Sequence, residues 1–258
     1  MKLLVISDIH AKPNSYYGLK ELLDKERPSL LLVLGDITNF GPAEFVDEFF
    51  SYIMPGKIML VKGKDFPSRK DEKRKETKNN GEAGEKGVEE GVRIVAIRGN
   101  CDVPEVKPRL SALGIDGELS IHETQSHVIL GIGGAPATPF GTPFEYDEEE
   151  VRPEIERLFE KASGISVKER KDFIVLSHAP PYGINDMVRG LHRGSGMLLE
   201  MCERYRPLLF LSGHIHEARG VEEQGGTLFV NPGPFKEGYY AVVEKKDKKY
   251  TAFLKSIN

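Results

Sequence analysis

Five short apolar segments of this chain each end in polar residues that can bind a metal ion. These polar clusters are Asp8-Ile9-His10, Gly35-Asp36, Gly99-Asn100-Cys101-Asp102, His178 and Gly213-His214-Ile215-His216. Short, nearly continuous apolar runs are typical of strands that are buried on both faces of a parallel sheet. In open α/β sheets, the loops at the carboxyl ends of the strands converge on one crevice. We therefore predict an α/β fold that brings the five clusters together.

The first quarter of the chain alternates apolar runs with amphipathic segments. Residues 2–7 and 30–34 are predicted strands, and residues 17–26 and 42–53 are predicted helices. This β-α-β-α order indicates parallel strands joined by crossover helices. Further helices are expected at 147–162 and 196–205, and further strands at 127–131, 173–176 and 208–211. The apolar segments 227–230, 239–243 and 250–254 are predicted to form a closing run of antiparallel strands.

Residues 62–91 interrupt this pattern with a highly charged segment that contains nine basic and eight acidic residues. Such a segment cannot bury enough apolar surface to offset its ordering entropy, so we predict an exposed, mobile insertion in a single domain spanning 1–258. The flanking segments 57–63 and 93–99 resemble each other, and we expect the second to be the central strand because it leads to Asn100. A basic arm for nucleic acid is the alternative, which the near balance of charge disfavours.

Composition narrows the function classes further. The net charge of -4 makes binding to nucleic acid by electrostatics alone an unfavoured hypothesis. No apolar run approaches the length of a membrane span, and two distant cysteines, Cys101 and Cys202, favour a reducing compartment. We therefore expect a cytoplasmic protein without membrane association, and a homodimer is compatible with the sequence. Abundant Lys and Glu, with little Gln and no Trp, favour a thermophilic source.

The donor atoms in the five clusters are carboxylate oxygens, a carboxamide oxygen and imidazole nitrogens. This mixture suits divalent Mn, Fe, Ni or Zn and not a zinc site made of thiolates. The donors are too numerous for a single four-coordinate ion, so we predict two ions that share a bridging carboxylate. Asp36 is the best candidate for the bridge, because the preceding Gly35 lets backbone and metal approach closely.

The clusters resemble, in order, the motifs of the calcineurin-like metallophosphoesterase superfamily: Asp-x-His, Gly-Asp, Gly-Asn-x-(Asp/Glu), His and Gly-His-x-His. The segments Ser177-His178-Ala179-Pro180-Pro181-Tyr182-Gly183, Gly213-His214-Ile215-His216-Glu217 and Asn231-Pro232-Gly233-Pro234 more specifically resemble the small Icc-related phosphoesterases. The resemblance implies a four-layered α/β/β/α sandwich of two mixed sheets flanked by helices. It also implies a division of the ligands. Asp8, His10 and His216 would hold one ion, and Asn100, His178 and His214 the other, with Asp36 between them.

The implied function is dimetal-dependent hydrolysis of small phosphate esters by a hydroxide that bridges the two ions, with phosphodiesters slightly favoured. Two alternatives have other functions. One is a catalytically weak or inactive scaffold of the same fold, which would have no need for seven metal-binding side chains. The other is a nuclease, which neither the net charge nor any additional partner-binding region supports.

One position departs from many members of the superfamily, in which a histidine follows the motif Asn. Here the residue is Cys101, and a thiol is a poor proton donor to a leaving alkoxide. His192 is an alternative proton donor and Arg193 a candidate clamp for a phosphate oxygen, although their segment also fits an ordinary surface turn. His122 and His127 are interpreted as strand positions. Pocket walls are expected from residues 135–146 and 182–195.

Overall fold

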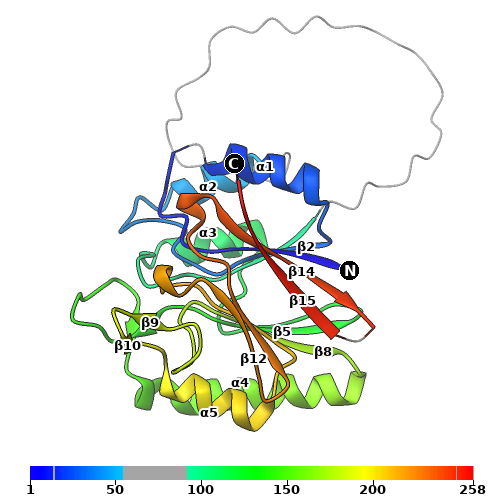
Figure 1. Ribbon diagram of the computed structural model, residues 1–258. Helices are drawn as coiled ribbons and strands as arrows, with labels where there is room; N and C mark the ends of the chain where they lie inside the picture. The colour runs from blue at the N-terminus through cyan, green and yellow to red at the C-terminus, as the bar shows by residue number, and fades with distance from the viewer. Residues whose placement is uncertain (14, 55–91, 248, 258) are drawn as a thin grey trace, which may run out of the picture.

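The computed structural model describes residues 1–13, 15–54, 92–247 and 249–257, and it has four layers (Figure 1). Two β-sheets lie at the centre, three helices cover the outer face of one sheet, and two helices cover the outer face of the other. The predicted insertion at 62–91 and its first flanking segment, 57–63, lie outside the described residues. The second flanking segment contains strand β3 (Arg93–Ala96).

The first sheet has five strands in the order β15-β14-β1-β2-β3. Its parallel half consists of β1 (Lys2–Ile6), β2 (Leu30–Val33) and β3. The long hairpin of β14 (Tyr239–Lys246) and β15 (Lys249–Ser256) extends the sheet, because β14 pairs antiparallel with β1. The amino-terminal and carboxyl-terminal segments of the chain are therefore joined in one sheet.

The second sheet has six strands in the order β12-β13-β11-β8-β5-β4. They are β4 (Ile121–Glu123), β5 (His127–Ile132), β8 (Asp172–Ser177), β11 (Leu209–Leu211), β12 (Gly220–Gln224) and β13 (Thr227–Asn231). The four central strands are parallel, whereas β4 and β12 pair antiparallel at the edges. The predicted closing run of antiparallel strands is therefore wrong for β13. This strand pairs parallel with β11, and its antiparallel neighbour is β12, a largely exposed strand that was not predicted because it carries one apolar side chain.

The outer layers are helical. The first sheet is covered by α1 (Ser15–Glu26), α2 (Phe45–Ser51) and α3 (Val106–Leu113), and the second by α4 (Glu148–Glu169) and α5 (Gly196–Tyr205). Helix α4 starts as predicted, because the Asp147 side chain accepts a hydrogen bond from the N–H of Glu149. It continues to Glu169, seven residues beyond the predicted end, although an interior glycine such as Gly164 weakens a helix. Among the described helices, none is long and apolar enough to cross a membrane.

Alternation along the strands explains how the layers are held together. In β1, Leu4 and Ile6 pack in a cluster with residues of the covering helices, whereas Leu3 and Val5 pack in a second cluster between the two sheets. A third cluster joins the second sheet to α4 and α5. Three continuous apolar layers between four structural layers confirm the predicted α/β/β/α sandwich of two mixed sheets flanked by helices.

Short elements complete the edge at which the parallel strands end. They are the strands β6 (Ala135–Pro136), β7 (Glu145–Tyr146), β9 (Met187–Val188) and β10 (Leu191–His192) and the 3₁₀ turns η1 (His216–Ala218) and η2 (Phe235–Glu237). They belong to the loops that follow β5, β8, β11 and β13. These loops therefore occupy the edge at which an α/β fold places its ligands.

Candidate metal centre

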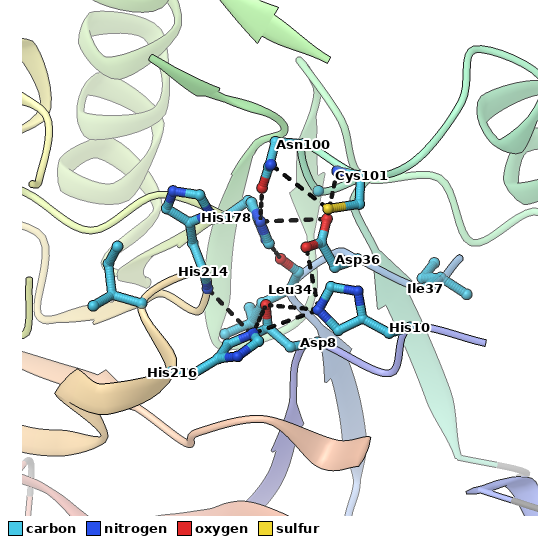
Figure 2. Close-up of polar contacts among 12 residues, drawn as sticks. Asp8, His10, Leu34, Asp36, Ile37, Asn100, Cys101, His178, His214 and His216 are labelled. Carbon is cyan, nitrogen blue, oxygen red and sulfur yellow. Dashed lines mark hydrogen bonds and ion pairs between the residues drawn. The ribbon is translucent and has the colours of Figure 1, made fainter. Parts of the chain in front are cut away.

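The seven residues predicted as metal ligands lie together at the carboxyl ends of five strands (Figure 2). The first sheet contributes Asp8 and His10 after β1, Asp36 after β2 and Asn100 after β3. The second contributes His178 after β8, and His214 and His216 after β11. The site is thus assembled from segments that are distant in sequence, and both sheets are needed to build it.

The backbone at this site is held in an unusual conformation. Asp8, His10, Asp36 and His214 have φ angles of 55°, 48°, 48° and 65°. Residues other than glycine rarely adopt positive φ, and such residues concentrate where function requires a fixed side-chain direction. Figure 2 shows these four residues gathered around one centre.

Glycines bring the segments close enough for their side chains to meet. A Cβ atom at Gly213 would lie 1.9 Å from Oγ of Ser7 and 2.7 Å from Oδ2 of Asp8. The N–H of the next residue, His214, donates a hydrogen bond to the same Asp8 oxygen over 3.2 Å. The Gly-His-x-His motif therefore starts with glycine because the second sheet has to contact the Asp8 loop of the first.

Asp8, His10 and His216 form the first group of donors. Nε2 of His216 lies 3.2 Å from Oδ1 of Asp8, and Nε2 of His10 lies 3.4 Å from Nε2 of His216. The three donor atoms lie within 4.8 Å of one another. Two imidazole nitrogens that face each other at this distance suit coordination to one shared cation, because a neutral imidazole offers a lone pair there. These residues can hold a metal ion.

Asn100 and His178 form the core of a second group. Oδ1 of Asn100 lies 2.8 Å from Nε2 of His178, and Nδ1 of His178 lies 2.8 Å from the carbonyl oxygen of Leu34. A carbonyl can only accept, so Nδ1 carries the proton and Nε2 presents a lone pair. The Asn100 oxygen and the His178 nitrogen then both offer lone pairs to a shared cation. The His214 ring lies beside them, with its centroid 5.1 Å from that of His178.

Asp36 lies between the two groups. Its Oδ2 is 3.5 Å from Nε2 of His10, and its Oδ1 is 3.5 Å from Nε2 of His178. Its carboxylate also joins Asp8 and His178 in a set of donor atoms within 4.8 Å of one another. One carboxylate oxygen therefore faces each group, which is the arrangement expected of a bridging ligand.

Charge supports occupation of this site by cations. Asp8 and Asp36 are 1% and 2% exposed, and their ionic partners among the described residues are histidines, not lysine or arginine side chains. Burial and the Asp8 carboxylate raise the pKa of Asp36 to about 6, although His178 opposes this shift. Two adjacent buried carboxylates are costly unless positive charge compensates them. The donor set therefore fits divalent metal ions.

Two of the histidines, His10 and His214, are prepared to act as neutral ligands, whereas the hydrogen bond with Asp8 raises the pKa of His216. Burial lowers the pKa of His10 to about 4, against the opposing influence of the Asp8 carboxylate. Burial and the neighbouring His178 lower the pKa of His214 to about 3. Both rings are therefore neutral at pH 7, which leaves a nitrogen lone pair for a metal ion.

A hydrogen-bond chain that the sequence analysis missed fixes the direction of the Asn100 carboxamide. Nδ2 of Asn100 donates to Oγ1 of Thr142 over 3.0 Å, and Thr142 donates in turn to Oε1 of Glu145 over 2.7 Å. Burial alone would raise the pKa of Glu145, but hydrogen bonds from Thr138 and Thr142 lower it to about 2. Glu145 is thus a fixed anionic acceptor, and Oδ1 of Asn100 is left facing His178.

Asp102, the last residue of the Gly-Asn-x-Asp motif, holds two ligand loops together. Its buried carboxylate accepts hydrogen bonds from the backbone N–H groups of Ile37, Thr38 and Gly99 over 3.1, 2.7 and 2.8 Å. The first two donors follow Asp36, and the third precedes Asn100. Asp102 therefore connects the loop of the bridging carboxylate to the loop of the second group through backbone hydrogen bonds.

Cys101 lies directly against the bridging carboxylate. Its backbone N–H donates to Oδ1 of Asp36 over 2.8 Å, and its Sγ is within 4.8 Å of donor atoms of His10 and Asp36. Burial and the charge of Asp36 raise the pKa of the thiol well above its usual range. In the metal-free chain the side chain is therefore a neutral thiol.

The remaining candidates lie outside this cluster. His192 is in β10, where its Nδ1 lies 2.6 Å from Oδ1 of Asp186, and Arg193 follows it with an exposed side chain. Neither makes a hydrogen bond or ion pair with the candidate ligands in the described part of the chain. His127 is a buried position of β5, and His122 lies on β4 beside Ser120.

Comparison with known proteins identifies the family. The family described as calcineurin-like phosphoesterase matches residues 1–218. The chain belongs to this family. The uncharacterized protein MJ1162 of Methanocaldococcus jannaschii is 29% identical over 254 residues, which cover 96% of this chain and 94% of MJ1162.

Two solved structures with this fold extend the comparison. TT1561 of Thermus thermophilus superposes with a TM-score of 0.66 at 14% identity, covering 98% of this chain and 97% of that one. A dimetal phosphatase of Danio rerio, LOC 393393, superposes with a TM-score of 0.60 at 10% identity, covering 99% of this chain and 96% of the phosphatase. At these identities the similarity concerns the calcineurin-like fold alone.

Proposed function

We propose that this chain hydrolyses phosphate esters with the help of two divalent metal ions, and that phosphodiesters are slightly preferred over monoesters. One observation carries the proposal: the Asp36 carboxylate directs one oxygen toward His10 and the other toward His178, each at 3.5 Å. A scaffold would not need two donor groups on either side of a buried carboxylate. The dimetal phosphatase of Danio rerio, which shares the fold, supports the same class of reaction.

The residues of the two groups would divide the ions between them. Asp8, His10 and His216 would hold one ion, Asn100, His178 and His214 the other, and Asp36 would contact both. Bound at this site, the ions would supply an activated water and would stabilise negative charge on the phosphate oxygens. The mixture of oxygen and nitrogen donors suits Mn, Fe, Ni or Zn.

The chain's own contribution is to hold the donors in place before substrate arrives. Leu34 fixes the His178 ring through its carbonyl, and Thr142 fixes the Asn100 carboxamide through its hydroxyl. Positive φ angles at four ligand positions fix the backbone. Such preorganisation avoids a reorganisation cost when charge develops in the transition state.

A metal-dependent assay tests the proposal. Metal-stripped protein would be supplied separately with Mn, Ni, Zn or Mg and assayed with bis(p-nitrophenyl) phosphate and p-nitrophenyl phosphate. We expect turnover that requires added metal, with a higher rate on the diester. Absence of turnover with every metal, in protein that binds two ions, would contradict the proposed hydrolase and favour the scaffold.

A further inference from the structure

The segment between His178 and α5 forms a lobe beside the candidate metal centre. The base of the lobe is closed by two hydrogen bonds, from the N–H of Tyr182 to the oxygen of Ser195 and from the N–H of Ser195 to the oxygen of Pro180, each over 2.9 Å. Within the lobe, His192 of β10 pairs with Met187 of β9. Strand β9 packs against η1, which begins at His216. The lobe thus starts just after one candidate ligand and contacts the turn that begins at another.

A cavity of about 450 Å³ separates the lobe from the chain that follows His216. Its walls include Asn185, Asp186, Met187 and His192 from the lobe, and Arg219 and Val221 from the opposite side. The volume is in the range of small-molecule sites.

His192 is held on this wall by a fixed carboxylate. Asp186 is 1% exposed and accepts hydrogen bonds from the backbone N–H groups of Gly183, Arg193 and Gly194 over 2.9, 3.2 and 2.9 Å. Its other interaction is with Nδ1 of His192, at 2.6 Å. Nε2 of His192 makes no hydrogen bond to any residue that the structure describes. A half-exposed imidazole with one nitrogen held by a carboxylate and the other free is suited to proton transfer.

We propose that this cavity binds the leaving alcohol of the phosphate ester and that Nε2 of His192 protonates its oxygen. The inference rests on the proposed function, because it assigns the departing half of the same substrate. Cys101, which follows Asn100, does not replace His192 in this role, because a thiol is a weak hydrogen-bond donor.

In the proposed step, proton transfer from His192 accompanies cleavage of the bond to the leaving oxygen. Oxygen of a water molecule forms the new bond to phosphorus, and the bond from phosphorus to the leaving oxygen breaks with its electron pair on that oxygen. The proton of the His192 imidazolium moves from Nε2 to this oxygen, which leaves as a neutral alcohol. The proton released by the attacking water enters solvent, and solvent returns one to His192. Asp186 holds the ring through Nδ1 and is a positioning residue.

A series of leaving groups tests the assignment. The substrates would be methyl phosphate diesters of p-nitrophenol, phenol and benzyl alcohol, whose alkoxides or phenolates leave with increasing difficulty. The variants would be His192→Gln and, as a matched control, His122→Gln, since His122 lies at the edge of the second sheet beside Ser120. Thermal melts would verify that both variants fold.

For His192→Gln we expect a loss in kcat of about 10²- to 10⁴-fold on the phenyl and benzyl esters. The loss on the p-nitrophenyl ester should be only a few-fold, because that phenolate needs no proton to leave. An equal loss on all three esters, or no loss, would overturn the proton-donor role while leaving the hydrolase intact. A wild-type protein inactive on all three esters with every metal would overturn both proposals.

A second variant tests the cavity itself. Val221→Trp would place a larger side chain in the cavity, which Val221 lines together with His192. Val221 is an exposed position of β12, so the fold should accept the larger side chain. We expect KM to rise for the benzyl ester and to stay close to wild type for dimethyl phosphate, whose leaving group is small. Equal KM changes for both esters, or none, would overturn the cavity as the leaving-group subsite.

Discussion

Gly99 lies in direct contact with the carboxylate of Asp36: a Cβ atom at this glycine would be 2.1 Å from Oδ1 of Asp36 and 2.6 Å from Cε1 of His178. The strand that delivers Asn100 therefore approaches the proposed bridging ligand at a distance that only glycine permits. The glycine before Asn100 is therefore required for close packing at the metal centre, and it also permits the turn after β3.

The contact predicts that Gly99→Ala damages metal binding. The added methyl group has to displace Asp36 or His178, so affinity for Mn should fall at least about tenfold, as expected when ligand positions are disturbed. Gly164→Ala is the matched control, because Gly164 lies in α4 with open space around it and should gain up to about 1 kcal/mol of helix stability. Calorimetric titration with Mn measures the metal affinity of both variants, and the control should keep the wild-type affinity. Unchanged affinity in Gly99→Ala would contradict the tight contact.

The chain from Asn100 through Thr142 to Glu145 predicts a defect at a distance from the ligands. Thr142→Val keeps the volume of the side chain but removes the hydroxyl that orients the Asn100 carboxamide. We expect metal affinity or kcat to fall about 10- to 100-fold. Thr227→Val is a suitable control, since it removes a buried hydroxyl that donates to the oxygen of Pro207 in another part of the fold. Equal metal affinity and equal kcat in wild type and Thr142→Val would contradict an orienting role.

Stability in acid should depend on Glu118. Its carboxylate accepts hydrogen bonds from Nε and Nη2 of Arg98 over 2.7 and 2.8 Å and from Nζ of Lys107 over 3.0 Å. Burial alone would raise the pKa of Glu118, but these cations lower it. A lowered folded-state pKa contributes stability above the unfolded pKa of about 4.3, and the contribution is lost as the pH falls through the folded value.

Glu118→Gln should therefore cost about 3–5 kcal/mol at pH 7, because it leaves Arg98 buried beside a neutral partner. The difference in the free energy of unfolding should narrow as the pH falls below the unfolded pKa of about 4.3 and then through the lowered folded pKa, where the wild-type carboxylate becomes protonated. Urea unfolding at several pH values measures the free energy of unfolding. Asp24→Asn is the control, because it removes only an exposed ion pair with Lys20. A difference that is independent of pH would contradict the role of the Glu118 charge.

The candidate ligands at the strand ends were predicted from the sequence, whereas the pairing of distant strands was not. Asp8, Asp36, Asn100 and His178 each follow a buried strand, and parallel strands place their carboxyl ends at one edge, so their convergence followed from local pattern alone. The resemblance of the motifs supplied the four-layered architecture. Pairing of β14 with β1 joins residues more than two hundred positions apart, and no local pattern predicts such a partner.

The residues that orient the ligands escaped prediction for a physical reason. Thr142 and Glu145 act through hydrogen bonds to side chains in other loops, and a threonine in a loop rich in Pro and Gly carries no periodic signal. Helix α3 was missed because it is short and Pro108 interrupts its apolar spacing. Asp186 was missed because an isolated carboxylate in a turn is common, and only the folded loop shows its four hydrogen bonds.

The number of metal ions bound per chain, measured together with activity, tests the central claim most directly. Metal-stripped wild type and Asp36→Asn would be equilibrated with Mn, freed of excess ion, and analysed by mass spectrometry for metal content and with bis(p-nitrophenyl) phosphate for turnover. We predict two ions per wild-type chain, fewer than two in Asp36→Asn, and turnover only in the wild type. A wild-type chain that holds fewer than two ions at full activity, or an Asp36→Asn chain that keeps two ions and full turnover, would contradict the account.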